Sequence, residues 1–292
     1  MKILILGTAG MLGHQLLMQL GANHETWGTV RGASNQLPNL PGINRSRIIE
    51  NVNALAIDTI SAAISTARPD VVINCIGLIK QREEAKKPLP AIDLNARFPH
   101  QVAALCADSG SRMIHISTDC VFSGKKGNYT EADLSDAEDI YGKTKALGEV
   151  VQEDHCLTIR TSIIGRELFS RYGLVEWFLG EKGTVKGFQK AIFSGFPTYA
   201  IGDFLQEYIL PNPNLHGLYH VSADPISKYD LLHLLRDAYN HPLEIIPDDK
   251  VMIDRSLNSE VFRAKTGFSP APWPELIEKM ASNSLPYDEW KQ

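Results

Sequence analysis

The stretch that decides the fold is Lys2–Gly13, KILILGTAGMLG, close to the start of the chain. Its first five residues form a short apolar run, which is typical of a buried β-strand. Glycines follow at once in the spacing GxxGxxG, and Met11–Leu20 then carries apolar residues at helical intervals. Gly7 permits a tight turn, Gly10 lets a pyrophosphate approach the backbone, and Gly13 lets the helix pack closely on the strand. Because a helix N-terminus attracts anions, this start predicts a dinucleotide-binding unit.

The whole glycine loop is a candidate cofactor site. Its predicted cofactor-binding residues are Gly7, Thr8, Ala9, Gly10, Met11, Leu12 and Gly13. The spacing differs from the commonest dinucleotide fingerprint, GxGxxG. The interpretation therefore depends on the position of the loop directly after an N-terminal strand, and the alternative is a glycine-rich turn that binds nothing.

Strands and helices alternate outward from this loop through the first half of the chain. Strands are predicted at Lys2–Leu6, Glu25–Val30, Ala54–Ile57, Val71–Ile76, Met113–Ser117 and Leu157–Thr161. Helices are predicted at Met11–Leu20, Ile60–Thr66, Ile92–Ser109 and Ile140–Glu153. This alternation predicts right-handed crossovers and an α/β fold, a Rossmann-type doubly wound parallel sheet.

The alternation loosens after Arg166. Gly217–Val221 is predicted as a strand, and Lys228–Tyr239 as a helix with Ser227 as its N-cap. We assign residues 1–165, with 196–221 returning to them, to the dinucleotide-binding domain. Residues 166–195 and 222–292 are assigned to a smaller C-terminal substrate-binding lobe. Ligands of such sheets bind at the carboxyl ends of the strands, so the cleft is expected between the two parts.

Composition and charge exclude several classes of function. The 292 residues carry 29 basic and 34 acidic side chains, a net charge of −5, which provides no basic field for a nucleic acid. No apolar stretch approaches the roughly 18 residues of a membrane span, and the first apolar run is too short for a signal peptide. We expect a cytoplasmic protein. The four cysteines form no CxxC pair, so reduced thiols are expected. His216 and His220 lie in a stretch that is predicted to pass from loop into strand, so no metal site is expected there.

Three further strand ends carry candidate cofactor contacts. Arg31 follows the second strand, where sites that prefer NAD usually have an acidic residue, so its guanidinium favours the 2′-phosphate of NADPH. Asp58 closes the predicted third strand and could accept from the adenine amino group. Cys75, Ile76 and Gly77 follow the fourth strand, where small residues would lie close to the cofactor. The alternative for Arg31 is an exposed loop position, and NADH remains an alternative cofactor.

A YxxxK pair provides candidate catalytic groups. Tyr141 and Lys145 are one helical turn apart and share a face. A free phenol has a pKa of about 10, and a nearby ammonium lowers that pKa, which makes Tyr141 a plausible proton donor to a carbonyl that accepts hydride. Thr118 ends the preceding strand and could hydrogen-bond the same carbonyl. The pair alone could mark an exposed helical face, but its coincidence with other polar strand ends favours an active site.

The chain resembles the extended short-chain dehydrogenases/reductases, and within them the dTDP-4-dehydrorhamnose reductase branch. The resemblance rests on the glycine loop, on Ile116–Gly124 (ISTDCVFSG) and on Tyr141–Glu149 (YGKTKALGE), and it covers nearly the whole chain. It implies that Tyr141 is the general acid, that Lys145 lowers the pKa of Tyr141 and holds the nicotinamide ribose, and that Thr118 hydrogen-bonds the reacting carbonyl.

The resemblance also implies a reaction. It is the NADPH-dependent reduction of the C4 keto group of a nucleotide-linked 6-deoxy-4-keto sugar, dTDP-4-dehydro-L-rhamnose to dTDP-L-rhamnose, in deoxysugar or surface-polysaccharide synthesis. One alternative is a reductase or epimerase of another deoxysugar nucleotide. The other is a non-catalytic nucleotide-binding protein, since one relative of this branch is a regulatory subunit of methionine adenosyltransferase. A homodimer is compatible with the resemblance.

Two departures from the family pattern affect the substrate pocket. Cys120 stands where the family usually has a tyrosine, and the segment after Asn74 differs from the usual sequence. Lys80 and Gln81 fall in that segment, where the loop is expected to face the sugar or its diphosphate; the alternative is a solvated charged loop. The candidate substrate-binding residues are Lys80, Gln81, Thr118, Asp119, Cys120 and Ser162.

Overall fold

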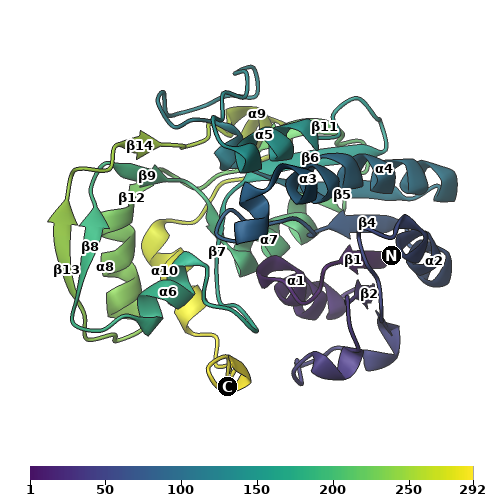
Figure 1. Ribbon diagram of the computed structural model, residues 1–292, viewed down its shortest axis with the longest axis horizontal. Helices are drawn as coiled ribbons and strands as arrows, with labels where there is room; N and C mark the ends of the chain where they lie inside the picture. Colours follow the sequence, from purple (N-terminus) through teal and green to yellow (C-terminus); the bar gives the residue numbers. More distant parts are fainter. Residues whose placement is uncertain (292) are drawn as a thin grey trace.

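A seven-stranded parallel sheet runs through the centre of the molecule (Figure 1). The computed structural model describes residues 1–291; residue 292, the last of the predicted C-terminal lobe, lies outside it. In spatial order the strands are β11 (Gly217–His220), β6 (Cys156–Thr161), β5 (Arg112–Thr118), β4 (Val71–Asn74), β1 (Lys2–Leu6), β2 (Glu25–Thr29) and β3 (Ile48–Ile49). The strand order reverses between β1 and β4, the point at which open sheets of this kind bind ligands. The predicted doubly wound α/β fold is confirmed.

The inner strand β1 explains why the sheet is covered on both faces. Ile3 and Ile5 pack in the larger apolar core, together with helix α1 (Met11–Gly21). Leu4 and Leu6 pack in a second core on the opposite face. Successive side chains of a strand point to opposite faces, so a continuous apolar run requires helices on both.

The helices that follow the strands cover these two faces. Those of the second core are α2 (Ile57–Ala67) and α4 (Phe98–Ser109), the latter preceded by α3 (Pro88–Ala91) and the π-helical turn η4 (Ile92–Arg97). Helix α1 packs against α7 (Thr198–Phe204), which continues into the π-helical turn η6 (Leu205–Ile209). Helix α5 (Ile140–Leu147) carries the YxxxK pair.

The remaining elements form small sheets and helices beside the carboxyl edge of the large sheet. The strands are β7 (Ile163–Ile164), β8 (Thr184–Phe188), β9 (Ala191–Phe193), β10 (Phe196–Pro197), β12 (Ile226–Ser227), β13 (Glu244–Asp248) and β14 (Ile253–Asp254). The helices are α6 (Leu174–Gly180), α8 (Lys228–Ala238), α9 (Glu260–Thr266) and α10 (Trp273–Ala281). Short 3-10 turns occur at η1 (Ser34–Gln36), η2 (Arg45–Arg47), η3 (Glu83–Lys86), η5 (Asp119–Val121) and η7 (Glu289–Lys291). The division into two domains stays a prediction.

Two predicted elements are wrong. The third strand is Ile48–Ile49 and not Ala54–Ile57, because Asn53 accepts the Leu55 N–H through its side chain, 3.1 Å, and turns the chain into α2. The predicted helix Ile140–Glu153 ends at Leu147, and the next residue, Gly148, is its C-cap, where a side chain would meet the backbone of Asn95.

Other details of the fold agree with the sequence. Helix α8 begins as expected, with the Ser227 hydroxyl accepting the Asp230 N–H at 3.0 Å. All four cysteines are free thiols. Among residues 1–291 no helix is long and apolar enough to cross a membrane.

Candidate active site

The glycine turn is held tightly between β1, β2 and α1. Gly7 has a φ of +86°, which only glycine adopts without strain. The Gly7 N–H donates to the Thr29 hydroxyl at 3.0 Å, and the Thr8 hydroxyl donates to the Thr29 carbonyl at 2.8 Å. A Cβ on Gly13 would lie 2.2 Å from the Gly7 carbonyl oxygen, so the helix packs directly on the turn, as the sequence predicts.

The start of α1 is open to an anion. Its N-cap is Gly10, and within the described residues no side chain caps it and no acidic residue lies in its first turn. Ala9 and Gly10 are exposed, whereas the side chains of Thr8 and Leu12 are buried. The loop therefore offers backbone N–H groups and the positive end of the helix dipole, the arrangement that fits the pyrophosphate of a dinucleotide.

The end of β4 meets the glycine turn and α5. A Cβ on Gly7 would lie 2.8 Å from Ile76, and one on Gly77 would lie 3.8 Å from the Lys145 ammonium. Cys75 is half-buried, and burial raises the pKa of its thiol to about 12. The segment after β4 thus lies where the sequence places it, at the carboxyl edge of the sheet.

Two asparagines hold this segment, and sequence reasoning missed both. The Asn74 side chain accepts the Ile76 N–H at 3.0 Å. The Asn95 side chain, from η4, accepts the Leu78 N–H at 2.8 Å. Asn74 directly precedes the predicted contacts and could have been found by its position; Asn95 carries no local signal because it comes from a distant helix.

Close packing against β5 positions helix α5. The Asp139 carboxylate caps its N-terminus by accepting the Gly142 N–H at 2.8 Å. A Cβ on Gly142 would lie 2.3 Å from the Cys120 carbonyl oxygen, so only glycine lets the helix approach this turn. This approach brings Tyr141 close enough to Thr118 for the Thr118 hydroxyl to act on the pKa of the phenol.

The acid–base state of Tyr141 differs from the sequence prediction. Burial raises the pKa of Tyr141 above its ordinary value, and the nearby Cys120 and Asp119 raise it further. The Thr118 hydroxyl lowers this pKa only in part. In the protein alone the net shift is therefore upward, opposite to the direction that the sequence predicts, and the lowering by the Lys145 ammonium stays a prediction. A phenol that stays protonated at neutral pH is suited to donating a proton.

The Lys145 ammonium points back to the sheet. It donates to the Ile116 carbonyl at 3.0 Å. Burial lowers its pKa to about 8, while Glu149 and Cys75 act to raise it. Lys145 thus lies beside Gly77 and the end of β5, with its charge sensitive to pH near neutrality.

Glu149 is a third residue that sequence reasoning missed. Its carboxylate accepts from the Ser117 hydroxyl at 2.7 Å and pairs with the Arg160 guanidinium at 2.7 Å, both side chains of the pair being almost fully buried. The YGKTKALGE motif includes Glu149, but its partners lie on β5 and β6, which no local pattern connects.

The turn after β5 carries three of the predicted substrate contacts. The Thr118 hydroxyl donates to the Asp119 carboxylate at 3.1 Å and accepts the Cys120 N–H at 3.1 Å. Burial raises the pKa of Asp119, although Arg255 acts to lower it. Burial also raises the pKa of Cys120 to about 12, so this thiol is neutral.

The other predicted substrate contacts, Lys80, Gln81 and Ser162, do not lie on the turn after β5. The Lys80 ammonium lies 2.6 Å from Asp139, the residue that caps α5, and Gln81 is exposed. Ser162 is half-buried, and its carbonyl accepts the Phe196 N–H at 2.8 Å.

Two predicted cofactor contacts belong to the other end of the sheet. Arg31 lies where the sequence predicts, exposed and two residues beyond β2, whereas Asp58 does not lie at a strand end. Asp58 lies in the first turn of α2, so its predicted place is wrong. The chain after β3 instead passes Val30, whose carbonyl accepts the Val52 N–H at 3.0 Å.

Comparison with known proteins identifies the family. A family model described as "RmlD substrate binding domain" matches residues 1–284. The chain is 28% identical to methionine adenosyltransferase 2 subunit beta of Mus musculus, over 95% of this chain and 89% of that protein. It is 24% identical to a dTDP-4-keto-6-deoxy-D-glucose reductase of Streptomyces niveus, over 85% of this chain and 83% of that one.

Solved structures resemble the whole chain. A hypothetical dTDP-4-dehydrorhamnose reductase from Sulfolobus tokodaii has a TM-score of 0.76 at 27% identity, covering 94% of this chain and 98% of that one. A dTDP-4-dehydrorhamnose reductase from Bacillus anthracis, solved in complex with NADP, has the same TM-score at 21% identity, covering 96% of each chain. The chain belongs to the RmlD substrate binding domain family of the extended short-chain dehydrogenases/reductases.

Proposed function

We propose that the protein reduces the C4 keto group of a nucleotide-linked 6-deoxy-4-keto sugar with NADPH. The observation that carries the proposal is the convergence of Thr118, Tyr141 and Lys145 with Gly77 at the carboxyl edge of the sheet, next to the open start of α1. A proton donor, a buried cation and an anion-binding helix end lie together, as ketone reduction by a dinucleotide requires.

The chain's own residues supply the proton and the geometry. When bound, reduced nicotinamide supplies the hydride. Tyr141 donates its proton to the carbonyl oxygen, and its raised pKa keeps that proton in place until the oxygen becomes basic. The Thr118 hydroxyl orients the same oxygen. Lys145 lies beside Gly77, where it would hold the ribose next to the nicotinamide.

NADPH is the proposed cofactor, with NADH as the alternative. The glycine turn, the uncapped start of α1 and the exposed Ala9 and Gly10 fit a pyrophosphate. Arg31 is exposed beyond β2, where a guanidinium can pair with a 2′-phosphate. The relative from Bacillus anthracis was solved with NADP, which supports the same choice.

The proposed substrate is dTDP-4-dehydro-L-rhamnose. The family and the names of two relatives support a deoxysugar nucleotide, whereas Cys120 and the Lys80–Gln81 segment leave room for another sugar. The test mixes the protein with NADPH or NADH and dTDP-4-dehydro-L-rhamnose and follows the loss of reduced nicotinamide absorbance. We expect turnover with NADPH. Turnover with other 4-keto nucleotide sugars only would move the proposal to those sugars.

A second candidate function comes from the curated relatives. The chain is 28% identical to a subunit of a methionine adenosyltransferase. A protein of that kind could keep the dinucleotide fold without using it for reduction. The test is whether the purified protein changes the rate of a methionine adenosyltransferase catalytic subunit, with Tyr141→Phe as the matched variant. An effect that survives this substitution, without ketone reduction, would favour the second function.

A further inference from the structure

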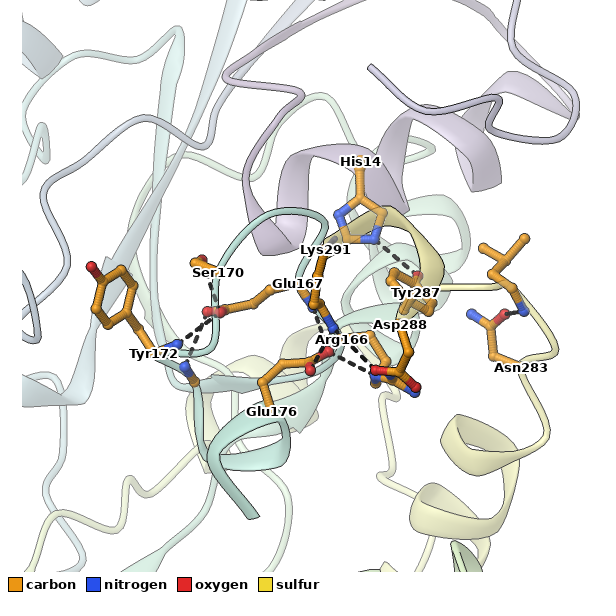
Figure 2. Close-up of polar contacts among 12 residues, drawn as sticks. His14, Arg166, Glu167, Ser170, Tyr172, Glu176, Asn283, Tyr287, Asp288 and Lys291 are labelled. Atoms are coloured by element: carbon orange, nitrogen blue, oxygen red, sulfur yellow. Dashed lines mark hydrogen bonds and ion pairs between the residues drawn. The ribbon is translucent and has the colours of Figure 1, made fainter. Parts of the chain in front are cut away.

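The last described residues lie against the helix that begins at the glycine turn (Figure 2). Tyr287 is only 2% exposed, and its hydroxyl lies 3.0 Å from His14 Nε2 on α1. The other ring nitrogen, His14 Nδ1, lies 2.9 Å from the Gly10 carbonyl oxygen. A single imidazole thus joins the C-terminal segment to the N-cap of the dinucleotide-binding helix.

The direction of these hydrogen bonds follows from the chemistry of the groups. Burial lowers the pKa of His14 to about 4, so the ring is neutral near pH 7 and carries one hydrogen. A carbonyl can only accept, so Nδ1 carries that hydrogen and donates it to Gly10. Nε2 therefore accepts from Tyr287, whose pKa is raised to about 12 by burial. The Gly10 carbonyl therefore fixes the tautomer of His14, and the Tyr287 hydroxyl holds the ring by donating to its other nitrogen.

A second path from the same segment reaches the neighbouring residue of α1. The Lys291 ammonium lies 2.5 Å from the Glu176 carboxylate, and both side chains are 2% exposed. Glu176 accepts the Glu167 N–H at 3.0 Å, and Glu167 in turn accepts the Gly173 N–H at 3.1 Å. A Cβ on Gly173 would lie 2.5 Å from the end of the Met11 side chain. Figure 2 shows this path from η7 to the loop before α6.

We propose that the C-terminal segment 285–291 positions the dinucleotide-binding turn, with Tyr287 acting through His14 on Gly10. The two paths end on Gly10 and Met11, which are the N-cap and the first residue of α1. Holding these residues before the cofactor arrives lowers the ordering cost of binding. Tyr287 is thus a positioning residue for cofactor affinity. This inference rests on the proposed dinucleotide site.

The test is Tyr287→Phe, which keeps the ring and its packing against Trp290 and removes only the hydroxyl. We expect the Kd for NADPH, measured by fluorescence titration, to rise about threefold to tenfold, the range for one lost buried hydrogen bond. The KM for NADPH should rise by the same factor, and kcat at saturating NADPH should stay unchanged. The control is Tyr199→Phe, whose hydroxyl donates to the Leu276 carbonyl at 3.1 Å; it should leave the Kd unchanged.

A second variant separates positioning from loss of stability. His14→Asn keeps an N–H donor near the position of Nδ1 and has no acceptor at the position of Nε2, which faces Tyr287. In that background Tyr287→Phe should not weaken NADPH binding further. A Kd within about twofold of wild type for Tyr287→Phe, or an equal loss in both backgrounds, would overturn the inference. Wild-type protein that binds neither NADPH nor NADH would overturn the proposed dinucleotide site as well.

Discussion

Replacing Gly13 with alanine places a methyl group where the structure has no room for one. The new Cβ would lie 2.2 Å from the Gly7 carbonyl oxygen, 2.8 Å from the Gly7 carbonyl carbon and 2.9 Å from the Thr8 Cα. An ordinary C···O contact is about 3.3–3.6 Å, so the turn must move by roughly 1 Å. All three neighbours are backbone atoms, which cannot rotate away.

The magnitude follows from two opposing effects. Alanine is favoured over glycine inside a helix by about 1 kcal/mol. Overpacking of this kind costs about 1–3 kcal/mol. We therefore expect Gly13→Ala to lower the free energy of unfolding by about 0–2 kcal/mol. The displaced Gly7–Thr8 peptide should weaken NADPH binding by at least about tenfold, a loss of about 1.4 kcal/mol.

The assay compares thermal unfolding and NADPH fluorescence titration for Gly13→Ala and for Gly21→Ala in the same helix. A Cβ on Gly21 would meet nothing closer than the Thr26 hydroxyl, at 3.1 Å. The control should bind NADPH like the wild type. Gly13→Ala with wild-type affinity and wild-type Tm would refute the claim that the helix is packed onto the turn.

Three further predictions concern charged residues around the site. Arg31→Ala should raise the KM for NADPH severalfold and leave that for NADH unchanged; equal losses for both cofactors would exclude a contact with the 2′-phosphate. Lys80→Ala should raise the KM for the nucleotide sugar; a fall in kcat with an unchanged KM would mean that Lys80 acts on α5 through Asp139 instead. Activity should fall as pH rises through about 8, where the Lys145 ammonium, lowered in pKa by burial, loses its charge. Glu149→Gln removes a charge that raises this pKa, so the activity of the variant should begin to fall at a lower pH than that of the wild type. An unshifted pH–rate profile would contradict the effect of Glu149 on Lys145.

Much of the fold could be predicted because its signals are local. The Lys2–Leu6 run is apolar on both faces, and the glycines follow it directly, so the first strand, turn and helix come out within a residue of their observed bounds. The predicted strand Ala54–Ile57 is wrong because a short apolar run does not distinguish a strand from the segment that leads into a helix. In the structure the Asn53 side chain accepts the Leu55 N–H and turns the chain into α2.

The site is harder to predict because its parts meet only in three dimensions. The spacing of Tyr141 and Lys145 places both on α5, and the structure adds that Gly142 lets the helix approach Cys120. The direction of the Tyr141 pKa shift could not be read from spacing, since it depends on burial. Asn95 comes from another element and gave no local signal, and the partners of Glu149 lie on β5 and β6, which its motif does not reveal.

The measurement that tests the central claim most directly is turnover and cofactor binding by Tyr141→Phe. The variant lacks only the phenolic hydroxyl, so the glycine turn and the start of α1 are untouched. The account predicts a Kd for NADPH close to that of the wild type, together with a fall in kcat of about 10²–10⁴-fold for reduction of dTDP-4-dehydro-L-rhamnose. Wild-type kcat in this variant would contradict the assignment of Tyr141 as the proton donor.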